Sequence, residues 1–363
     1  MFTTPPRLVL LTAFLAFILF WMTTGSAVSL AMAGGQVDPG VRASILAGQW
    51  YPSSAVELRA VVRGYIDRAR PLDSRGLLVG LIAPHAGYLF SGPVAGAAYH
   101  FLRDHPVETV VVVAPSHRTA FKGVSVYDAG GYETPLGVAP LDTEFIAALK
   151  KRARPELLTF LPEAHAQEHA VEIQVPFLQV ALPGFKLVPL VMGDQHPLTC
   201  RALADALADV ILASAPKKVL LLASTDLSHF HDSATAKALD GRVLDCVRDF
   251  RPDLLWNCLK DGTCEACGGG PVLAVMFAAA RLGASKGAIL AHGDSGDVTG
   301  DHDKVVGYMA AALLAQKNSA KPAPSAVEVQ TEDSDAETPT PSAENSSHAT
   351  SATKLAPAEE TVL

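Results

Sequence analysis

Histidine and aspartate residues follow three short apolar runs of this 363-residue chain, close to the point where each run ends. His85 stands in the sequence Ala-Pro-His, and His117 stands in the similar sequence Ala-Pro-Ser-His. Asp226 and His229 share the sequence Asp-Leu-Ser-His after a third run. A single histidine in such a place is most often a hydrogen-bonded core or loop residue. The repetition at three run ends instead favours one shared site, where imidazole and carboxylate groups bind a metal ion or move protons.

The five cysteines divide into two kinds. Cys200, Cys246 and Cys258 lie in apolar segments with helical character, and we interpret them as small core residues. Cys264 and Cys267 form a Cys-x-x-Cys motif before a glycine-rich turn that enters a helix, a position that favours a thiolate. The motif is compatible with a disulfide, a redox pair or half of a zinc site. Because no second Cys-x-x-Cys exists, a closed four-cysteine zinc site is excluded.

The segment Glu-His-Ala-Val-Glu at 168–172 offers a further histidine. His169 and Glu172 are three residues apart, so a helix would place both on one face, as in a metal-binding helix. The order of residues differs from the His-Glu-x-x-His motif of zinc proteases. The alternative is a histidine at a helix start beside a capping carboxylate.

The elements that must position these residues alternate along the chain. Short, continuously apolar, β-branched runs indicate strands buried on both faces. We expect such strands at 78–82, 109–113, 187–192, 219–222 and 288–290. We expect helices at 56–68, 94–101, 143–152, 169–180, 199–214, 234–249 and 271–282. The alternation predicts a three-layer α/β/α sandwich with a central, largely parallel or mixed sheet, which binds ligands at the carboxyl ends of its strands.

Composition excludes several classes of protein. The chain is 49% hydrophobic and 18% charged, with a mean hydropathy of +0.24, so it is neither disordered, collagen-like nor a coiled coil. A formal net charge of −8 and the absence of a Lys/Arg block argue against a nucleic-acid partner. The sequence also lacks the Gly-x-Ser-x-Gly motif of serine hydrolases and the phosphate-binding Gly-x-x-x-x-Gly-Lys-[Ser/Thr] loop.

The two ends of the chain differ from the middle. Residues 1–33 combine Arg7, an apolar run over 8–22 and the small-x-small sequence Ala-Met-Ala, so we predict a signal peptide or membrane anchor. Residues 34–316 are predicted to form one α/β domain. Residues 317–363 are rich in Ala, Ser, Thr, Pro and Glu, so we expect a disordered acidic tail. We therefore expect an exported protein, periplasmic or extracellular, that contacts a membrane only through an uncleaved N-terminal anchor.

The ordered set of motifs resembles the Memo family, the mediator of cell motility, whose prokaryotic members are called AmmeMemoRadiSam system protein B. The motifs are Ala-Gly-Gln-Trp-Tyr-Pro at 47–52, Ala-Pro-His-Ala-Gly-Tyr at 83–88, Ala-Pro-Ser-His at 114–117, Tyr-Glu-Thr-Pro-Leu-Gly at 132–137, Glu-His-Ala-Val-Glu at 168–172, Ser-Thr-Asp-Leu-Ser-His at 224–229, Cys-Gly-Gly-Gly-Pro at 267–271 and Ser-Gly-Asp-Val-Thr-Gly-Asp at 295–301. The resemblance covers the whole middle of the chain and implies a fold similar to class III extradiol dioxygenases.

The resemblance also implies a site. His85, His117 and Cys267 would occupy the metal-binding positions, with Asp226 and His229 beside them, and His169 matches a further family histidine. The dioxygenases use two histidines and a carboxylate, so a thiol in that place argues against ring cleavage. A thiolate shifts the preference toward copper(I), zinc or a redox-active iron. We expect a metal cofactor, iron or copper first and zinc as the alternative.

Two functions of different classes follow. The first is a metal-dependent redox protein or oxidoreductase, in which Asp226 orients His229, and His229 or His169 moves protons. The second is a non-catalytic module whose cleft binds a peptide or a protein, and a zinc hydrolase is a third interpretation. The ligand, a small molecule or a peptide, is not defined by the sequence. A disulfide between Cys264 and Cys267 would remove the thiol ligand, so we also expect the redox state to control metal binding.

Overall fold

The computed structural model describes residues 40–70 and 76–316, so the predicted N-terminal signal and the predicted acidic tail lie outside the described residues. The strands are β1 (Val41–Arg42), β2 (Leu77–Ala83), β3 (Thr109–Pro115), β4 (Val124–Val126), β5 (Gly131–Thr134), β6 (Gly137–Pro140), β7 (Leu158–Thr159), β8 (Lys186–Met192), β9 (Val219–Ser224), β10 (His229–His231), β11 (Ala284–Asp294) and β12 (Val305–Ala315). The helices are α2 (Ala55–Arg68), α3 (Tyr88–Leu102), α4 (Thr143–Arg152), α5 (Pro162–Ala166), α6 (His169–Glu172), α7 (Val175–Ala181), α8 (Pro197–Ala213), α9 (Ser233–Arg248), α10 (Pro252–Lys260), α11 (Gly269–Arg281) and α12 (Gly296–Thr299).

A large mixed sheet forms the centre of the domain. Its strand order is β10-β12-β2-β9-β3-β8-β4-β7, and β11 pairs with β12 at the β10 side of the sheet. The four strands β2, β9, β3 and β8 run parallel, whereas β12 is antiparallel to β2 and β4 is antiparallel to β8. The predicted mixed sheet with a parallel centre is therefore confirmed. A second, smaller sheet has the order β1-β5-β6.

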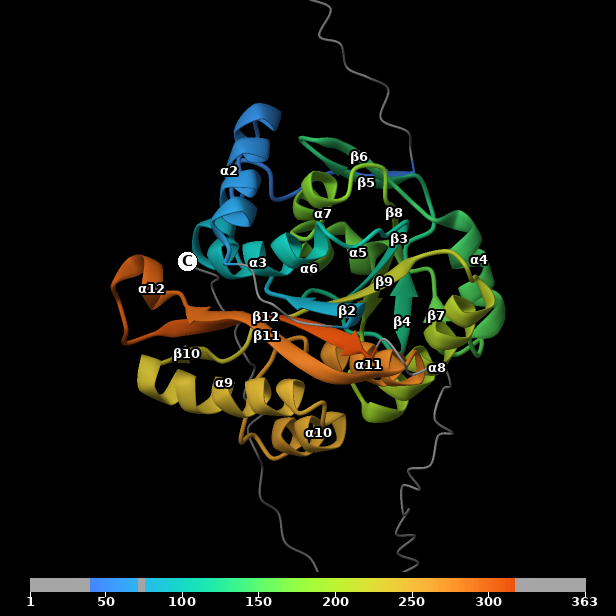
Figure 1. Cartoon of the computed structure of the whole chain (residues 1–363). Coiled ribbons are helices and arrows are strands. Elements are labelled where there is room, and N and C mark those ends of the chain that lie inside the picture. Colours follow the sequence, from blue (N-terminus) through green and yellow to red (C-terminus); the bar gives the residue numbers. More distant parts are fainter. Residues whose placement is uncertain (1–39, 71–75, 317–363) are drawn as a thin grey trace, which may run out of the picture. The chain divides into compact units, whose positions relative to one another are not determined.

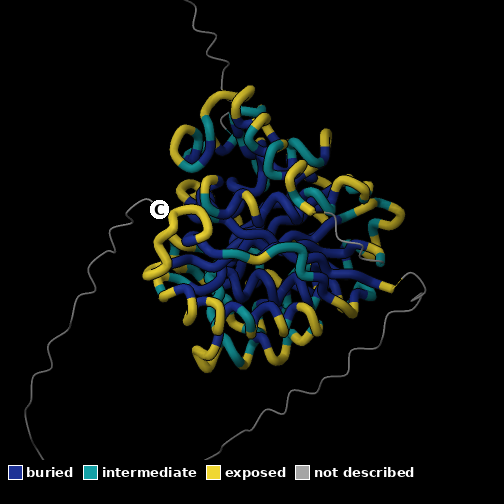
Figure 2. Tube along the Cα trace, turned by 60° about the vertical axis from the view of Figure 1, so that its left-hand side comes forward, coloured by how far each residue is buried: buried dark blue, intermediate teal, exposed yellow. Residues whose placement is uncertain are grey.

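Helices cover both faces of the large sheet, which gives the three layers predicted (Figure 1). In Figure 1, α2, α3, α6 and α7 lie above the sheet, and α9, α10 and α11 lie below it. Strand β3 is buried along its whole length, and so is β12, because helices shield both of their faces. Figure 2 shows the buried strands as a continuous centre with the exposed residues on the outer helices and loops.

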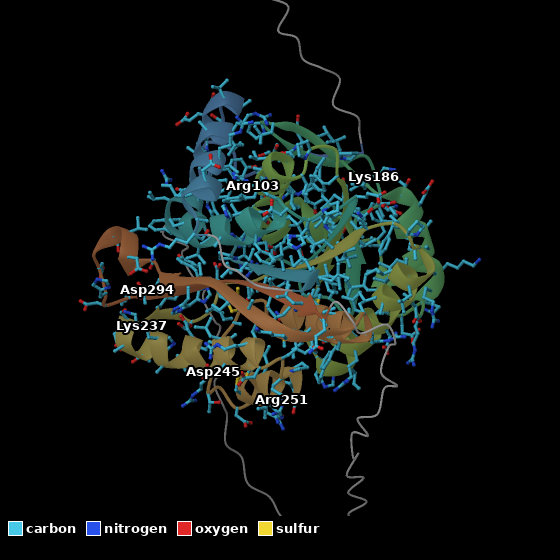
Figure 3. All side chains as sticks on the ribbon, viewed as in Figure 1. Arg103, Lys186, Lys237, Asp245, Arg251 and Asp294 are labelled. Carbon is cyan, nitrogen blue, oxygen red and sulfur yellow. A yellow bond between two sulfur atoms is a disulfide. The ribbon has the colours of Figure 1, made fainter. Side chains whose placement is uncertain are left out.

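Two further findings concern charged residues on the surface and the search for a membrane-spanning helix. Three charged residues of α9 and the turn after it, Lys237, Asp245 and Arg251, lie on the outside of the lower layer (Figure 3). Within the described part of the chain, no helix combines the length and the apolar character needed to span a bilayer.

The parallel centre of the sheet positions the functional residues. Strands β2, β9 and β3 are neighbours and run in one direction, so their carboxyl ends meet at one edge. His85, Asp226 and His117 each come two residues after the last residue of one of these strands. The prediction that these residues gather at one edge of the sheet is confirmed for all three.

Candidate metal centre

Three histidines converge at the carboxyl edge of the parallel strands. His85, His117 and His169 each offer one ring nitrogen, and these nitrogens lie within 4.8 Å of one another. His85 and His117 follow β2 and β3, whereas His169 is the first residue of the short helix α6. Imidazole nitrogens this close can share one metal ion, because metal–nitrogen bonds of about 2.0–2.1 Å place ligand atoms a few ångströms apart.

Hydrogen bonds determine which ring nitrogen of His85 faces the other two histidines. The Ser224 hydroxyl donates to the Ala170 carbonyl at 2.7 Å and accepts from the Gln174 side-chain amide at 2.8 Å. Because its hydrogen is already used, Ser224 Oγ acts as an acceptor toward His85 Nδ1, 3.1 Å away. His85 therefore carries its proton on Nδ1 and presents the Nε2 lone pair, which is the form that binds a metal.

Burial keeps that imidazole neutral. The His85 side chain is almost fully buried, and desolvation holds its pKa well below the usual value. The neighbouring charges of His117 and His169 lower this pKa further. The neutral ring needs no deprotonation before it can serve as a ligand.

Glu168 orients the second histidine in the same manner. Its Oε1 accepts a hydrogen bond from His117 Nδ1 at 2.9 Å, and its Oε2 accepts from the His117 backbone N–H at 2.6 Å. Because an ionised carboxylate can only accept, His117 also carries its proton on Nδ1 and exposes Nε2. Glu168 Oε1 additionally lies 3.4 Å from His169 Nδ1. This is the carboxylate–histidine arrangement that supports many metal sites.

Glu168 is also the helix cap that the sequence left as an alternative. Its side chain accepts from the Ala170 backbone N–H at 2.9 Å, which satisfies a free donor at the start of α6. Burial opposes ionisation of this carboxyl, but the hydrogen bond from His117 and the charges of His169 and His117 outweigh it and lower its pKa to about 2. Glu168 thus remains a carboxylate at neutral pH.

Glu172 does not join the histidines, although the spacing placed it on the same helix face. It is fully buried and pairs with the guanidinium of Arg42. It also accepts from the hydroxyl of Tyr51 at 2.6 Å and from that of Ser44 at 2.8 Å. His169 of the segment 168–172 thus joins a histidine group that could hold a metal ion, whereas the metal-helix interpretation is wrong for Glu172, which instead attaches the N-terminal segment to α6.

Cys267 contacts the group through His85. Its Sγ lies 3.1 Å from His85 Nε2 and accepts from the Asp226 backbone N–H at 3.3 Å. Burial raises the pKa of the Cys267 thiol well above its usual value, and the charge of Asp226 raises it further. Burial of the Cys267 thiol therefore opposes the thiolate that its position before a helix favours, and it is the larger effect on the pKa. A bound metal would deprotonate a coordinating thiol.

The structure rules out a disulfide between Cys264 and Cys267, one of the alternatives that the Cys-x-x-Cys motif left open. Cys264 is bonded to Cys258, and their Cα atoms are 5.3 Å apart. Cys267 carries a free thiol. Cys258 is thus a disulfide partner and not merely a small core residue, and the proposed control of metal binding by a Cys264–Cys267 bond is withdrawn.

Asp226 contacts His85 instead of orienting His229. Its Oδ1 accepts from the His85 backbone N–H at 2.7 Å, and its Oδ2 lies 3.9 Å from His85 Nε2. The ring of His229 is held elsewhere, with Nδ1 2.8 Å from the carbonyl of Leu227. Burial raises the pKa of Asp226 to about 6, and the charge of His229 opposes this shift. The expectation that Asp226 orients His229 is therefore wrong, because Asp226 holds the His85 backbone and His229 Nδ1 faces the Leu227 carbonyl.

A cavity of about 500 Å³ borders the group on the Cys267 side. Cys267 and His229 both belong to its wall. His117 provides a second approach, because its side chain is 27% exposed whereas those of His85 and His169 are almost fully buried. His117 is thus the histidine of the group that a ligand can reach from outside, and Cys267 is the site residue that faces the cavity.

The donor set fits a transition metal. Two imidazoles present unprotonated nitrogens, a third lies with them, and a thiol stands beside His85. Imidazole suits iron, copper and zinc, and a thiolate favours copper(I) and zinc. The sequence placed His85, His117 and Cys267 at metal positions and assigned His169 a proton-moving role, whereas the structure places His169 with the two histidines; Ser224 and Gln174 were missed as supports. Ser224 could have been found from its position at the last residue of β9.

Three comparisons place the chain among known proteins. The family profile described as Memo-like protein matches residues 42–312. A MEMO1 family protein of Thermotoga neapolitana is 36% identical over 285 residues, which cover 75% of this chain and 99% of that protein. A MEMO1 family protein of Methanopyrus kandleri is 35% identical over 280 residues, covering 74% of this chain and 97% of that protein.

A solved structure is also similar. It is an uncharacterized protein from Escherichia coli K12, with a TM-score of 0.44 and 15% identity, covering 65% of this chain and 99% of that one. This similarity is too distant to carry an argument about function. The profile match and the two relatives agree with the motifs at the strand ends: the chain belongs to the Memo family.

Proposed function

We propose that the protein is a metal-dependent redox protein or oxidoreductase that works outside the cytoplasm, with iron or copper as its metal. The observation that carries the proposal is the convergence of His85, His117 and His169 within 4.8 Å. Ser224 and Glu168 hold two of these rings with their protons away from the group. Such pre-orientation is expected of a binding site and is unnecessary in a purely structural core.

His85 and His117 would bind the metal, with His169 and the Cys267 thiol as the candidates for the remaining positions. A bound iron or copper would supply one-electron chemistry and an open position for a small ligand. The residues of the chain would surround the metal and control what reaches it. Burial of His85 and Glu168 excludes bulk water from one side, and His229 stands in the cavity wall where it can exchange a proton with a ligand.

Cobalt(II) substitution would identify the ligands. Cobalt bound to a thiolate gives an intense charge-transfer absorption, whereas three imidazoles give only weaker ligand-field bands. We expect Cys267→Ser to remove the charge-transfer band if the thiol is a ligand, and His169→Ala to change the ligand-field bands if the imidazole is. The buried Cys200→Ser variant is the matched control for the loss of a thiol elsewhere.

The redox function is tested by oxygen consumption. Protein loaded anaerobically with iron(II) or copper(I) is mixed with dioxygen and ascorbate in an oxygen-electrode cell. We expect sustained consumption by the wild type and by His105→Ala, whose ring bonds to the Phe101 carbonyl outside the site. His117→Ala should lose it. Metal-bound wild-type protein that neither consumes oxygen nor changes its oxidation state would reject this proposal in favour of a non-catalytic binding module.

A further inference from the structure

We propose that the cavity beside Cys267 binds a small, largely apolar organic anion, with its apolar body inside and its anionic group at Lys260. This inference rests on the proposed function in one respect: the bound anion would be the molecule on which the metal centre acts. The binding itself is independent of the metal.

The size and the position of the cavity favour a small molecule. Its volume of about 500 Å³ lies within the range of about 300–1,000 Å³ that is usual for small-molecule sites. Cys267 lies in its wall, 3.1 Å from the His85 nitrogen that faces the histidine group. A molecule in the cavity would therefore lie beside the metal ligands and not at a remote surface.

The wall is mainly apolar. Leu227 and Leu273 are fully buried behind it, and Leu259, Ala266 and the indole of Trp256 complete it. An indole beside leucine side chains favours a planar ring or an aliphatic chain. The body of the ligand is thus expected to be hydrocarbon or aromatic.

The two charged side chains of the wall differ in whether they already have a partner. Glu265 is occupied, because both of its oxygens lie 3.0 Å from His231 Nε2. Lys260 is exposed at the end of α10 and forms no ion pair with any residue of the described chain. Lys260 is therefore the charged wall residue that a ligand can pair with, while Glu265 is directed at His231, and the complement of Lys260 is a carboxylate, sulfonate or similar group.

The polar backbone of the glycine-rich turn does not compete for the anion. The Gly270 N–H donates to Gln195 Oε1 at 2.7 Å, and the Gly268 N–H donates to Thr225 Oγ1 at 2.9 Å. Gln195 Nε2 in turn donates to the Cys267 carbonyl at 2.8 Å. Because these groups are satisfied, the anion has Lys260 as its partner and the turn acts as a rigid wall.

The Cys258–Cys264 disulfide holds the α10 side of the cavity wall in place. Cys258 belongs to α10, which carries Trp256 and Lys260, and its bond to Cys264 joins this helix to the loop before Cys267. The backbone N–H of Thr263 also donates to the Cys258 carbonyl at 2.9 Å. A preformed cavity loses less entropy on binding than a flexible one, so even a small probe should bind measurably.

Isothermal titration calorimetry with three matched probes tests the inference. The probes are 4-phenylbutanoate, 4-phenylbutanamide and 4-phenylbutylamine, which share a phenyl group and chain but differ in charge. We expect the carboxylate to bind about three- to fivefold more tightly than the amide, the strength of an exposed ion pair. The amine should bind least. Equal affinities, or preference for the amine, would overturn the proposal.

Variants locate the binding. Lys260→Met should reduce the affinity for the carboxylate to that for the amide and leave the amide unchanged, and Lys260→Arg should restore the difference. Ala266→Phe places a ring in the half-buried wall and should abolish binding of the carboxylate and the amide. Lys237→Met on α9, outside the cavity wall, is the control for a lost surface charge. Carboxylate binding unchanged by both Lys260→Met and Ala266→Phe would show that the cavity is not the site.

The same titrations separate this inference from the proposed function. We expect the carboxylate to bind both to chelator-treated and to metal-loaded protein, because no wall residue other than Cys267 belongs to the candidate ligands. Binding with no metal-dependent oxygen consumption would reject the proposed function and leave the cavity inference standing. Oxygen consumption without selective binding of the carboxylate would do the reverse.

Discussion

At the residue scale, the candidate metal centre depends on side chains that are not themselves candidate ligands. Ser224 and Glu168 determine which ring nitrogen His85 and His117 present, and Ser224 acts as an acceptor because its hydroxyl hydrogen is donated to the Ala170 carbonyl. Buried networks of this kind are effective only when every member is satisfied. The site is therefore sensitive to substitutions of these supporting residues as well as of the histidines.

The first prediction concerns Ser224. Replacing Ser224 by Ala removes the acceptor at His85 Nδ1, so the ring loses its fixed tautomer, and we expect metal affinity to fall about 10- to 100-fold. Competition with a chromophoric chelator measures this affinity. Ser228→Ala is the matched control, because the Ser228 hydroxyl is buried in the same segment but has no hydrogen-bond partner among the described residues. Equal affinities in the two variants would contradict the role of Ser224.

A second prediction uses the buried His165. Its ring nitrogens lie 2.7 Å from the Tyr132 hydroxyl and 3.0 Å from the Ser125 hydroxyl, and burial lowers its pKa to about 3, with the charge of Arg42 adding to the shift. Below its unfolded pKa of about 6.5, the unfolded chain binds a proton that the folded chain does not. The stability from neutral His165 is therefore complete above pH 6.5 and is lost as the pH falls toward 3.

Urea unfolding between pH 6.5 and pH 4 measures this loss. We expect the unfolding free energy of the wild type to fall more steeply with decreasing pH than that of His165→Gln, by about one proton per molecule. Gln keeps one donor and one acceptor for the two hydroxyls. Parallel pH profiles of the two proteins would show that His165 does not titrate in this way.

At the scale of elements, the short helix α6 joins the site to the N-terminal part of the domain. Arg42 of β1 pairs with Glu172 and donates to the Glu168 carbonyl at 2.8 Å. Glu168 and His169 stand at the start of this same helix. The small sheet thus supports the position of two site residues through one buried ion pair.

Breaking this pair tests its contribution to stability. Arg42→Met leaves Glu172 buried without its cation, and we expect the unfolding free energy to fall by about 3–5 kcal/mol. Arg251→Met, which breaks the exposed pair with Asp253, should leave stability unchanged within error. Chemical denaturation gives both values. A small effect of Arg42→Met would show that hydrogen bonds from Tyr51 and Ser44 suffice to hold Glu172.

The sequence predicted an element well where the residue pattern of that segment was typical of a helix or a strand. The helix over 143–152 and the strand starting at 109 were located correctly, because the first has helical periodicity and the second is a β-branched apolar run. Strand β12 was missed, since its alanine-rich sequence lacks the β-branched pattern. Helix α3 starts six residues before the predicted 94, because Gly92 and Pro93 obscured its first turns. The pairing of Cys258 with Cys264 could not be predicted, because connectivity depends on the folded loop.

At the scale of the whole molecule, the described residues, 40–70 and 76–316, contain the large sheet, both helix layers and the candidate site. The family profile matches nearly the same segment, 42–312. The predicted signal and acidic tail stay predictions, because they lie outside the described residues.

Truncation tests this division. We expect a chain of residues 34–316 to have the same melting temperature and metal affinity as the longer chain without its signal, residues 34–363. Differential scanning calorimetry and chelator competition give the two quantities. A clear drop in either would mean that the segment after residue 316 contributes to the domain.

The metal content of the purified protein tests the central claim most directly. The wild type, His85→Ala and the control His105→Ala are isolated from the compartment in which the protein resides and analysed by inductively coupled plasma mass spectrometry. We expect about one iron or copper ion per chain in the wild type and in His105→Ala, and less than about a tenth of that in His85→Ala, because a site that loses an imidazole loses most of its affinity. Equal metal content in all three proteins, or none in the wild type even after reconstitution, would contradict a metal centre at these histidines.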